Sequence, residues 1–322
     1  MQPKTVLPLL LVLVMMFSSA CGGGEATVIG EDQPLEGYLS ISGAWALYPM
    51  MQRWAEEFKV ANPGVTIDVS AGGAGKGMAD ALSDAVDIGM VSRDITADEE
   101  ARGAFWVPVT KDAVFPDVNA QNPVLADLLR QGISQEMLVG IFITGEITTW
   151  GQVVGRPEIT DAIHVYTRSD SCGAAETWAK YLGNSQQEDL LGIGIYGDPG
   201  LLDAVIKDPL GIGYNNLNYV FDLSTGVAVS GAAVVPIDTN ANGTADADEL
   251  LETKAEAVEM VATGRFPSPP ARALNLVTHG KPDGLTQAFI AWILSDGQAY
   301  VDEAGYIPLT AEQLEAALQK IR

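Results

Sequence analysis

Residues 41–58, ISGAWALYPMMQRWAEEF, decide the fold class because a strand end, a glycine-containing loop and an amphipathic helix follow one another there. The pattern predicts a strand over Gly37–Ser42 and a helix over Tyr48–Ala61. The apolar residues of that helix recur at helical spacing: Met51, Trp54, Ala55 and Phe58. This order indicates an α/β unit with mostly parallel strands. Such units bind ligands where loops leave the carboxyl ends of the strands.

The same order of elements continues along the chain. Strands are predicted over Val65–Ser70 and Val86–Val91, separated by a glycine- and alanine-rich loop at 71–77 and a short helix. Further on, a strand over Ile163–Arg168 leads into a helix over Ala174–Leu182. The sequence therefore predicts a second α/β unit.

Elements nearer the carboxyl terminus are less regular. Val227–Val229 and Ala233–Ile237 are predicted to pair as a hairpin. Helices are predicted over Glu249–Ala262 and Leu285–Val301.

Two segments are predicted to link the units: Thr110–Phe115 and the proline-rich stretch 266–271. A chain with two links leaves the first lobe, builds the second and returns. We therefore expect lobe I to comprise 37–112 and 270–322, and lobe II to comprise 113–269. This arrangement favours hinge closure over a ligand between the lobes.

The first residues predict export. Residues 1–21 read as a lipoprotein signal peptide, because a basic residue and a short apolar stretch lead through small residues to Cys21. Cys21 is the expected lipidation site, residues 22–36 are the expected tether, and ordinary secretion is the alternative. We expect an extracytoplasmic, membrane-anchored monomer.

Composition bounds the class of protein. The chain has 322 residues, of which 47% are hydrophobic and 7% aromatic, which is typical of a globular protein. The net charge of −24 argues against nucleic acid and anionic lipid surfaces as partners. Salt screens remote charges beyond about 8 Å, so a local group of donors can still bind an anion.

Three loops join a predicted strand to a predicted helix: 43–47, 71–77 and 169–173. Helix amino termini expose unpaired N–H groups and carry partial positive charge, which suits an anion. Arg93 and Arg168 follow predicted strands, where a guanidinium fork would meet an oxyanion. Surface salt bridges are the alternative role for both arginines.

Several segments, taken in order, resemble the PstS-type phosphate-binding proteins. These segments are 41–58, 62–65, 72–77, 87–93, 141–150, 165–173, 211–214 and 267–272. The resemblance covers nearly the whole mature chain. It implies an α/β fold of the two-lobed periplasmic-binding-protein kind (type II, Venus-flytrap), with a hinge of two crossing segments. It also implies capture of phosphate for an ABC importer, without catalysis.

The resemblance, carried over position by position, assigns the anion contacts to residues from both lobes. They are Ala44, Trp45, Ala46, Ala74, Gly75, Ser92, Arg93, Arg168, Cys172, Gly173 and Ala174. The family's hydroxyl donors are replaced here by Trp45, Ala74, Cys172 and Ala174, so we expect backbone amides to contribute most of the contacts.

The family's aspartate near position 93 accepts a proton from hydrogen phosphate, which Arg93 cannot do. Asp94, Asp170 or Glu176 are candidates for that role. The expected ligand is phosphate, with another oxyanion or a small organic anion as the alternative. A different class of function, an adhesion or signalling module with an inactive cleft, also stays open.

A separate motif at 238–249 matches the EF-hand loop. Its expected calcium ligands are Asp238, Asn240, Asn242, the carbonyl of Thr244, Asp246 and Glu249. Calcium takes about seven oxygen ligands, which this spacing supplies. No helix is predicted before the loop, so a structural ion is expected rather than a sensor. A polar turn without metal is the alternative.

Enzyme signatures are weak. Cys172 at a helix start has no motif that links it to His164 or His279 as a base. In the glycine-rich loop Lys76 is followed by Gly77 rather than Ser or Thr, so the phosphate-binding loop of nucleotide enzymes is not present. We expect no enzyme activity and no organic cofactor.

Overall fold

The computed structural model describes residues 34–322. The expected signal peptide, Cys21 and most of the tether lie outside the described residues. Residues 35–322 form one compact unit. No helix in the part of the chain that the structure describes is both long and apolar enough to cross a membrane.

Within residues 34–322, one mixed sheet of nine strands organises the fold. Its order is β2-β1-β3-β11-β4-β8-β6-β7, and β9 also pairs with β4. The strands are β1 (Glu36–Gly43), β2 (Gly64–Ala71), β3 (Ile88–Val91), β4 (Ala104–Asn119), β6 (His164–Arg168), β7 (Ile193–Ile195), β8 (Gly211–Asn216), β9 (Ala232–Val234) and β11 (Ala271–His279). A separate pair joins β5 (Ile133–Ser134) to β10 (Ile237–Asp238).

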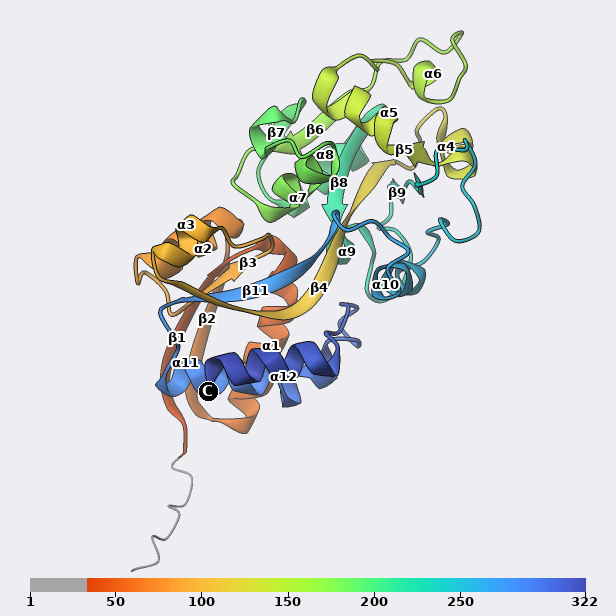
Figure 1. Ribbon diagram of the computed structural model, residues 1–322. Coiled ribbons are helices and arrows are strands. Elements are labelled where there is room, and N and C mark those ends of the chain that lie inside the picture. Colours follow the sequence, from red (N-terminus) through yellow and green to blue (C-terminus); the bar gives the residue numbers. More distant parts are fainter. Residues whose placement is uncertain (1–33) are drawn as a thin grey trace, which may run out of the picture. The chain divides into compact units, whose positions relative to one another are not determined.

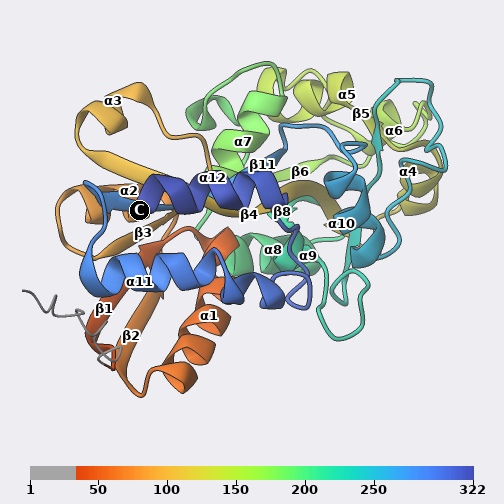
Figure 2. The same ribbon diagram turned by 60° about the horizontal axis from the view of Figure 1, so that its bottom comes forward.

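Helices pack around these strands (Figure 1). They are η1 (Trp45–Leu47), α1 (Tyr48–Ala61), α2 (Ala74–Leu82), α3 (Ala97–Ala101), α4 (Leu125–Gln131), α5 (Gln135–Val139), the π-turn η2 (Gly140–Thr144), α6 (Trp150–Val153), α7 (Gly173–Tyr181), η3 (Gln187–Asp189), α8 (Asp198–Lys207), α9 (Leu217–Val220), α10 (Lys254–Ala262), α11 (Gly284–Ile293), η4 (Asp296–Tyr300) and α12 (Ala311–Ile321). Helix α11 contacts both α1 and α12 (Figure 2).

Two hydrophobic cores divide the chain. One contains residues from 39–109 and 274–321, including Trp54 and Phe289. The other contains residues from 113–271 together with Ile307. We call the parts built on these cores lobe I and lobe II. In lobe II the rings of Trp178 and Tyr214 stack with their centroids 5.6 Å apart.

Strands β4 and β11 connect the lobes (Figure 1). Strand β4 pairs antiparallel with β11 over 104–113 and with β8 over 114–118, so a single strand belongs to both lobes. The segment Thr110–Phe115, expected as a link, is therefore the middle of a continuous strand. The backbone of β4 pairs with β11 before the point where it passes between the lobes and with β8 after it. The side chains of Val114 and Phe115 are part of the lobe II core.

Three sequence expectations are wrong in detail. Residues 227–229 and 233–237 do not form a hairpin: β9 pairs with β4, β10 pairs with β5, and Ala228 bridges to Phe221. The helix expected from Glu249 begins at Lys254, because Thr253 and Glu256 form a capping box. The helix expected over Leu285–Val301 ends at Ile293, and the 3-10 turn η4 follows it.

Candidate functional site

The predicted loops of the two lobes meet. The amide of Gly75, at the start of α2, donates to the carbonyl of Ser171 at 3.1 Å. Ser92, after β3, lies against Gly173, where an added Cβ would come within 2.2 Å of the Ser92 carbonyl oxygen. Only glycine permits so close an approach. The structure therefore places the start of α2 and the start of α7 at one interface between the lobes.

Arg168 ends β6 at this interface, and its side chain is 0% exposed. Asp170 accepts from Nε at 2.8 Å and from Nη2 at 2.6 Å, and Asp198 accepts from Nη1 at 2.6 Å. Burial acts to lower the pKa of Arg168, but the attraction of these carboxylates is larger and raises that pKa. Arg168 is therefore a permanently charged group held in one orientation.

Some predicted amide donors are already engaged. The amide of Ala44 donates to Met90 at 2.8 Å, and that of Cys172 donates to the side chain of Gln187 at 3.0 Å. The amides of Gly75, Ala44 and Cys172 therefore all have acceptors within the protein. The expectation that these three amides are free to bind an anion is wrong for this state of the protein. Ala74, Gly173 and Ala174 are buried first-turn residues of α2 and α7. Helix geometry gives such amides no acceptor within their own helix, so they are the stronger candidates.

The loop at 44–46 contacts lobe II. The Trp45 carbonyl accepts from the Tyr219 hydroxyl at 3.1 Å, and the Trp45 ring packs edge-on against Tyr196. Within lobe I, the Ala46 carbonyl accepts from Tyr306 at 2.8 Å. These contacts fix the loop in the interface.

Arg93 is bound to carboxylates. Its Nη2 lies 2.6 Å from Glu99 and its Nε lies 3.0 Å from Glu176 of α7, across the interface. Neighbouring Asp94 pairs with Lys180 of α7 at 2.5 Å. An anion could use Arg93 only if these pairs opened, so its role as a ligand stays a prediction. Asp94, its neighbour in the chain, accepts from Arg93 only through the backbone carbonyl, at 2.9 Å.

Of the three candidate proton acceptors, only Asp170 pairs with Arg168. An added Cβ on Gly73, which precedes α2, would lie 3.0 Å from Asp170 Oδ2, so this oxygen faces lobe I. Asp94 is 81% exposed and holds Lys180, while Glu176 holds Arg93.

Cys172 is the N-cap of α7. Its Sγ accepts from the amide of Ala175 at 3.3 Å, and burial raises the pKa of the thiol to about 12. His164 binds Asp208, and His279 binds Asp84. These contacts describe a capping thiol rather than a thiolate nucleophile.

The sequence reasoning missed Asp198, which follows Gly197 at the start of α8. Its Oδ1 accepts from Asn216 at 2.5 Å, and Arg272 donates to the Asn216 side chain. The Gly-Asp-Pro order marks a helix start. It carries no signal that the carboxylate faces Arg168.

The loop at 238–249 is described in full. Asp238 accepts from the amides of Asn242 at 3.1 Å and Gly243 at 2.8 Å, and Glu249 accepts from the amide of Thr239 at 2.8 Å. The side-chain amides of Asn240 and Asn242 both donate to Asp246. Among residues 34–322, no three side chains of His, Cys, Asp or Glu lie close enough together to hold a metal ion.

Comparisons with known proteins identify the family. Residues 26–297 match the model of the PBP superfamily domain. The phosphate-binding protein PstS of Bacillus subtilis is 30% identical over 95% of this chain and 94% of its own length. PstS of Methanocaldococcus jannaschii is 24% identical over 97% of this chain and 92% of its own length.

Solved structures show the same fold. A phosphate ABC transporter substrate-binding protein from Clostridium perfringens, with bound phosphate, superposes with a TM-score of 0.68 at 23% identity. It covers 85% of this chain and 100% of its own. An ABC-type phosphate transport receptor from Vibrio cholerae gives 0.61 at 21% identity, covering 84% and 100%. The α/β, two-lobed fold is thereby confirmed, and this chain belongs to the PBP superfamily, among proteins of the PstS type.

Proposed function

We propose that this protein is an extracytoplasmic solute-binding protein that captures phosphate between its lobes and delivers it to an ABC importer. One observation carries the proposal: the buried guanidinium of Arg168 lies where the first turns of α2 and α7 meet across the lobes. Such amides and a fixed guanidinium replace the water around an oxyanion. The names of the relatives support phosphate as the anion.

Capture requires the lobes to separate. The lobe-to-lobe bond from Gly75 to Ser171 occupies an amide at the proposed site, so entry of the ligand would break it. A ligand that contacts both lobes stabilises the closed form by the difference in its contacts with the two states. Strands β4 and β11 supply the two crossing segments about which the lobes would move. We propose that the protein binds and releases its ligand without catalysing a reaction.

A different oxyanion or a small organic anion is the second candidate. The alanines at 74 and 174 favour it, because they remove hydroxyl donors that the resemblance led us to expect. Thermal unfolding with phosphate, sulfate, molybdate and succinate separates the two. At one hundred times its Kd, a ligand adds about 2.7 kcal/mol to stability. If no anion shifts the melting temperature, the capture proposal fails and an inactive cleft is favoured.

Asp170→Asn should reduce discrimination between phosphate and sulfate. Hydrogen phosphate can donate a proton to the Asp170 carboxylate, whereas sulfate has none to donate. We expect the ratio of the two affinities, measured by calorimetry, to fall about tenfold, the scale of one hydrogen bond to a charged group. Asp94→Asn is the control, because Asp94 is exposed to solvent and pairs with Lys180 rather than with Arg168. An unchanged ratio in a folded Asp170→Asn protein would remove Asp170 from the site.

We also propose that the 238–249 loop binds calcium as a structural ion, through Asp238, Asn240, Asn242, Thr244, Asp246 and Glu249. Asp238 and Glu249 are only 5% and 4% exposed, and the hydrogen bonds that they accept come from uncharged amides and one hydroxyl. Buried carboxylates are costly without a positive charge. Rotation of the two asparagine side chains would present their oxygens to the ion.

Calcium should raise the melting temperature by about 3 °C at saturation, the shift that about 2 kcal/mol gives in a chain of this size. A chelator should reverse the shift. Asp238→Ala should abolish the response, whereas Asp248→Ala, at an exposed position that the motif does not use, should retain it. A melting temperature that ignores millimolar calcium in the native chain contradicts the proposal.

Finally, we propose that Cys21 is lipidated and anchors the protein to the outer face of the membrane as a monomer. Mass spectrometry of the membrane fraction, with Cys21→Ser as control, tests the anchor.

A further inference from the structure

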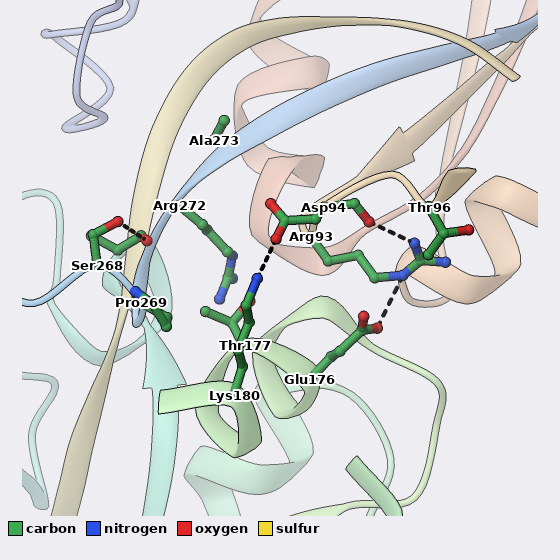
Figure 3. A pocket seen from close by; sticks show the side chains of 11 residues that line it. Arg93, Asp94, Thr96, Glu176, Thr177, Lys180, Ser268, Pro269, Arg272 and Ala273 are labelled. Atoms are coloured by element: carbon green, nitrogen blue, oxygen red, sulfur yellow. Dashed lines mark hydrogen bonds and ion pairs between the residues drawn. The ribbon is translucent and has the colours of Figure 1, made fainter. Parts of the chain in front are cut away.

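A cavity between the lobes includes Arg93 in its wall. It has a volume of about 470 Å³ and is bounded by the segment after β3, by three residues of α7 (Glu176, Thr177 and Lys180) and by the start of β11. Figure 3 shows its lining residues. It shares Arg93 with the predicted anion contacts, but Arg168 and the start of α7 are not part of its wall. Apart from Arg93, the cavity is therefore distinct from the proposed phosphate site.

Two ion pairs form one side of this cavity. Arg93 binds Glu176 at 3.0 Å, and Asp94 binds Lys180 at 2.5 Å (Figure 3). Glu176 and Lys180 are four residues apart and so share one face of α7. Each pair joins the two lobes, and the opposite charges within each pair neutralise one another. We call these four residues the clasp.

Arg272, on β11, is the basic lining residue outside the clasp. Its side chain is 6% exposed, and Figure 3 shows it reaching toward Thr177 of α7. It donates to Asn216 and forms an ion pair with buried Asp112 at 3.6 Å, a distance too long for a hydrogen bond. The guanidinium atoms Nε and Nη1 are buried and have no hydrogen-bond partner. Unpaired buried donors are costly, and more so when they carry charge.

The wall also limits the kind of ligand. Three of its side chains are basic and two are acidic, and Glu99 and Asp112 also pair with Arg93 and Arg272. Unpaired donors on Arg272, rather than a net positive charge, therefore favour an anionic group. Pro269, Ala271 and Ala273 add an apolar surface. The volume exceeds that of an inorganic oxyanion, and a fork of N–H groups matches a carboxylate.

We propose that this cavity binds a small organic carboxylate, with the carboxylate on Arg272 and the carbon chain against Pro269 and Ala271. Since Arg272 Nε and Nη1 are shielded from water here, the ligand enters when the clasp opens. It then contacts both lobes and stabilises the closed form. Occupancy of this cavity and of the Arg168 site is thereby coupled through lobe closure.

The test is calorimetry on the whole mature chain with propionate, succinate and adipate as probes, each with and without saturating phosphate. We expect one of them to bind one-to-one in both conditions. Arg272→Gln should weaken that binding about tenfold or more, the scale of a lost charge-assisted pair. In the arm without phosphate, Asp170→Asn, which alters the first site, should leave carboxylate binding unchanged. The arm without phosphate keeps the test valid if phosphate itself does not bind.

Ala273→Leu provides a second variant, because it fills the cavity while keeping Arg272. It should block the carboxylate and preserve the melting temperature, and it serves if Arg272→Gln does not fold. Three results overturn the proposal: no binding of any probe, displacement of the probe by phosphate, or equal binding by wild type and both variants.

Discussion

Arg168→Met will lower the free energy of unfolding by about 3–5 kcal/mol, the usual cost of removing one partner of a buried ion pair. Asp198 is 1% exposed and Asp170 is 6% exposed, so neither carboxylate can regain full hydration in the folded state. The loss arises less from the missing attraction than from the two negative charges left in the interior. The same change should remove anion binding at the proposed site.

Urea unfolding of the two proteins measures the effect. Adding Asp198→Asn to Arg168→Met should restore part of the stability, because it removes one of the stranded charges. Arg156→Met is the matched control: Arg156 also binds two carboxylates, but it is 50% exposed. Exposed pairs contribute about 1 kcal/mol or less. A loss below 1 kcal/mol for Arg168→Met would contradict the account of the site.

Asp117→Asn should stabilise the protein in a pH-dependent way. Burial raises the pKa of Asp117 to about 7, against a bond from Asn215 that lowers it and repulsion from Asp198 that raises it further. Its Oδ1 accepts from Asn215 at 3.0 Å, and its Oδ2 has no partner. Asparagine has nearly the same shape, preserves the first contact and does not titrate.

The sign follows from proton linkage. Unfolded aspartate has a pKa of about 3.9. Between about pH 4 and pH 7 the folded state keeps a proton that the unfolded state releases, so the contribution of Asp117 is complete below about pH 4 and is lost as the pH rises through about 7. The advantage of Asp117→Asn should thus be small at pH 4 and approach about 4 kcal/mol above pH 7.

Unfolding of both proteins from pH 4 to pH 8 tests this expectation. Subtracting the two free energies of unfolding removes the contribution of titrating groups that both proteins contain. One such group is buried Asp112, whose pKa is raised to about 6 by burial. A difference that is constant across the range would show that Asp117 titrates alike in both states.

Local order was predictable from the sequence. Strand, loop and helix follow one another at 41–58 because the period of the apolar residues changes within a few positions, and this order appears as β1, η1 and α1. The ends of β6 and α7 follow from the same reasoning, so Arg168 and the start of α7 were correctly placed beside each other. The EF-hand spacing at 238–249 is equally local, although its calcium remains a proposal.

Short strands were less predictable. Strands β9 and β10 contain three and two residues, and their pairing with β4 and β5 depends on segments about 100 residues away. A few apolar residues fit a hairpin as well as they fit two separate pairings. Which pairing forms is decided by the neighbouring strands β4 and β5, which the folded structure brings close.

The sequence by itself determined the α/β class, the second lobe and the loops that reach the interface, because each depends on residues close together in the chain. Only the tertiary structure decided which charges meet. Asp198 lies thirty residues beyond Arg168, and Glu176 reaches Arg93 from the other lobe. Among 42 acidic residues, spacing cannot rank such partners, because contact across a fold depends on packing and burial rather than on local periodicity.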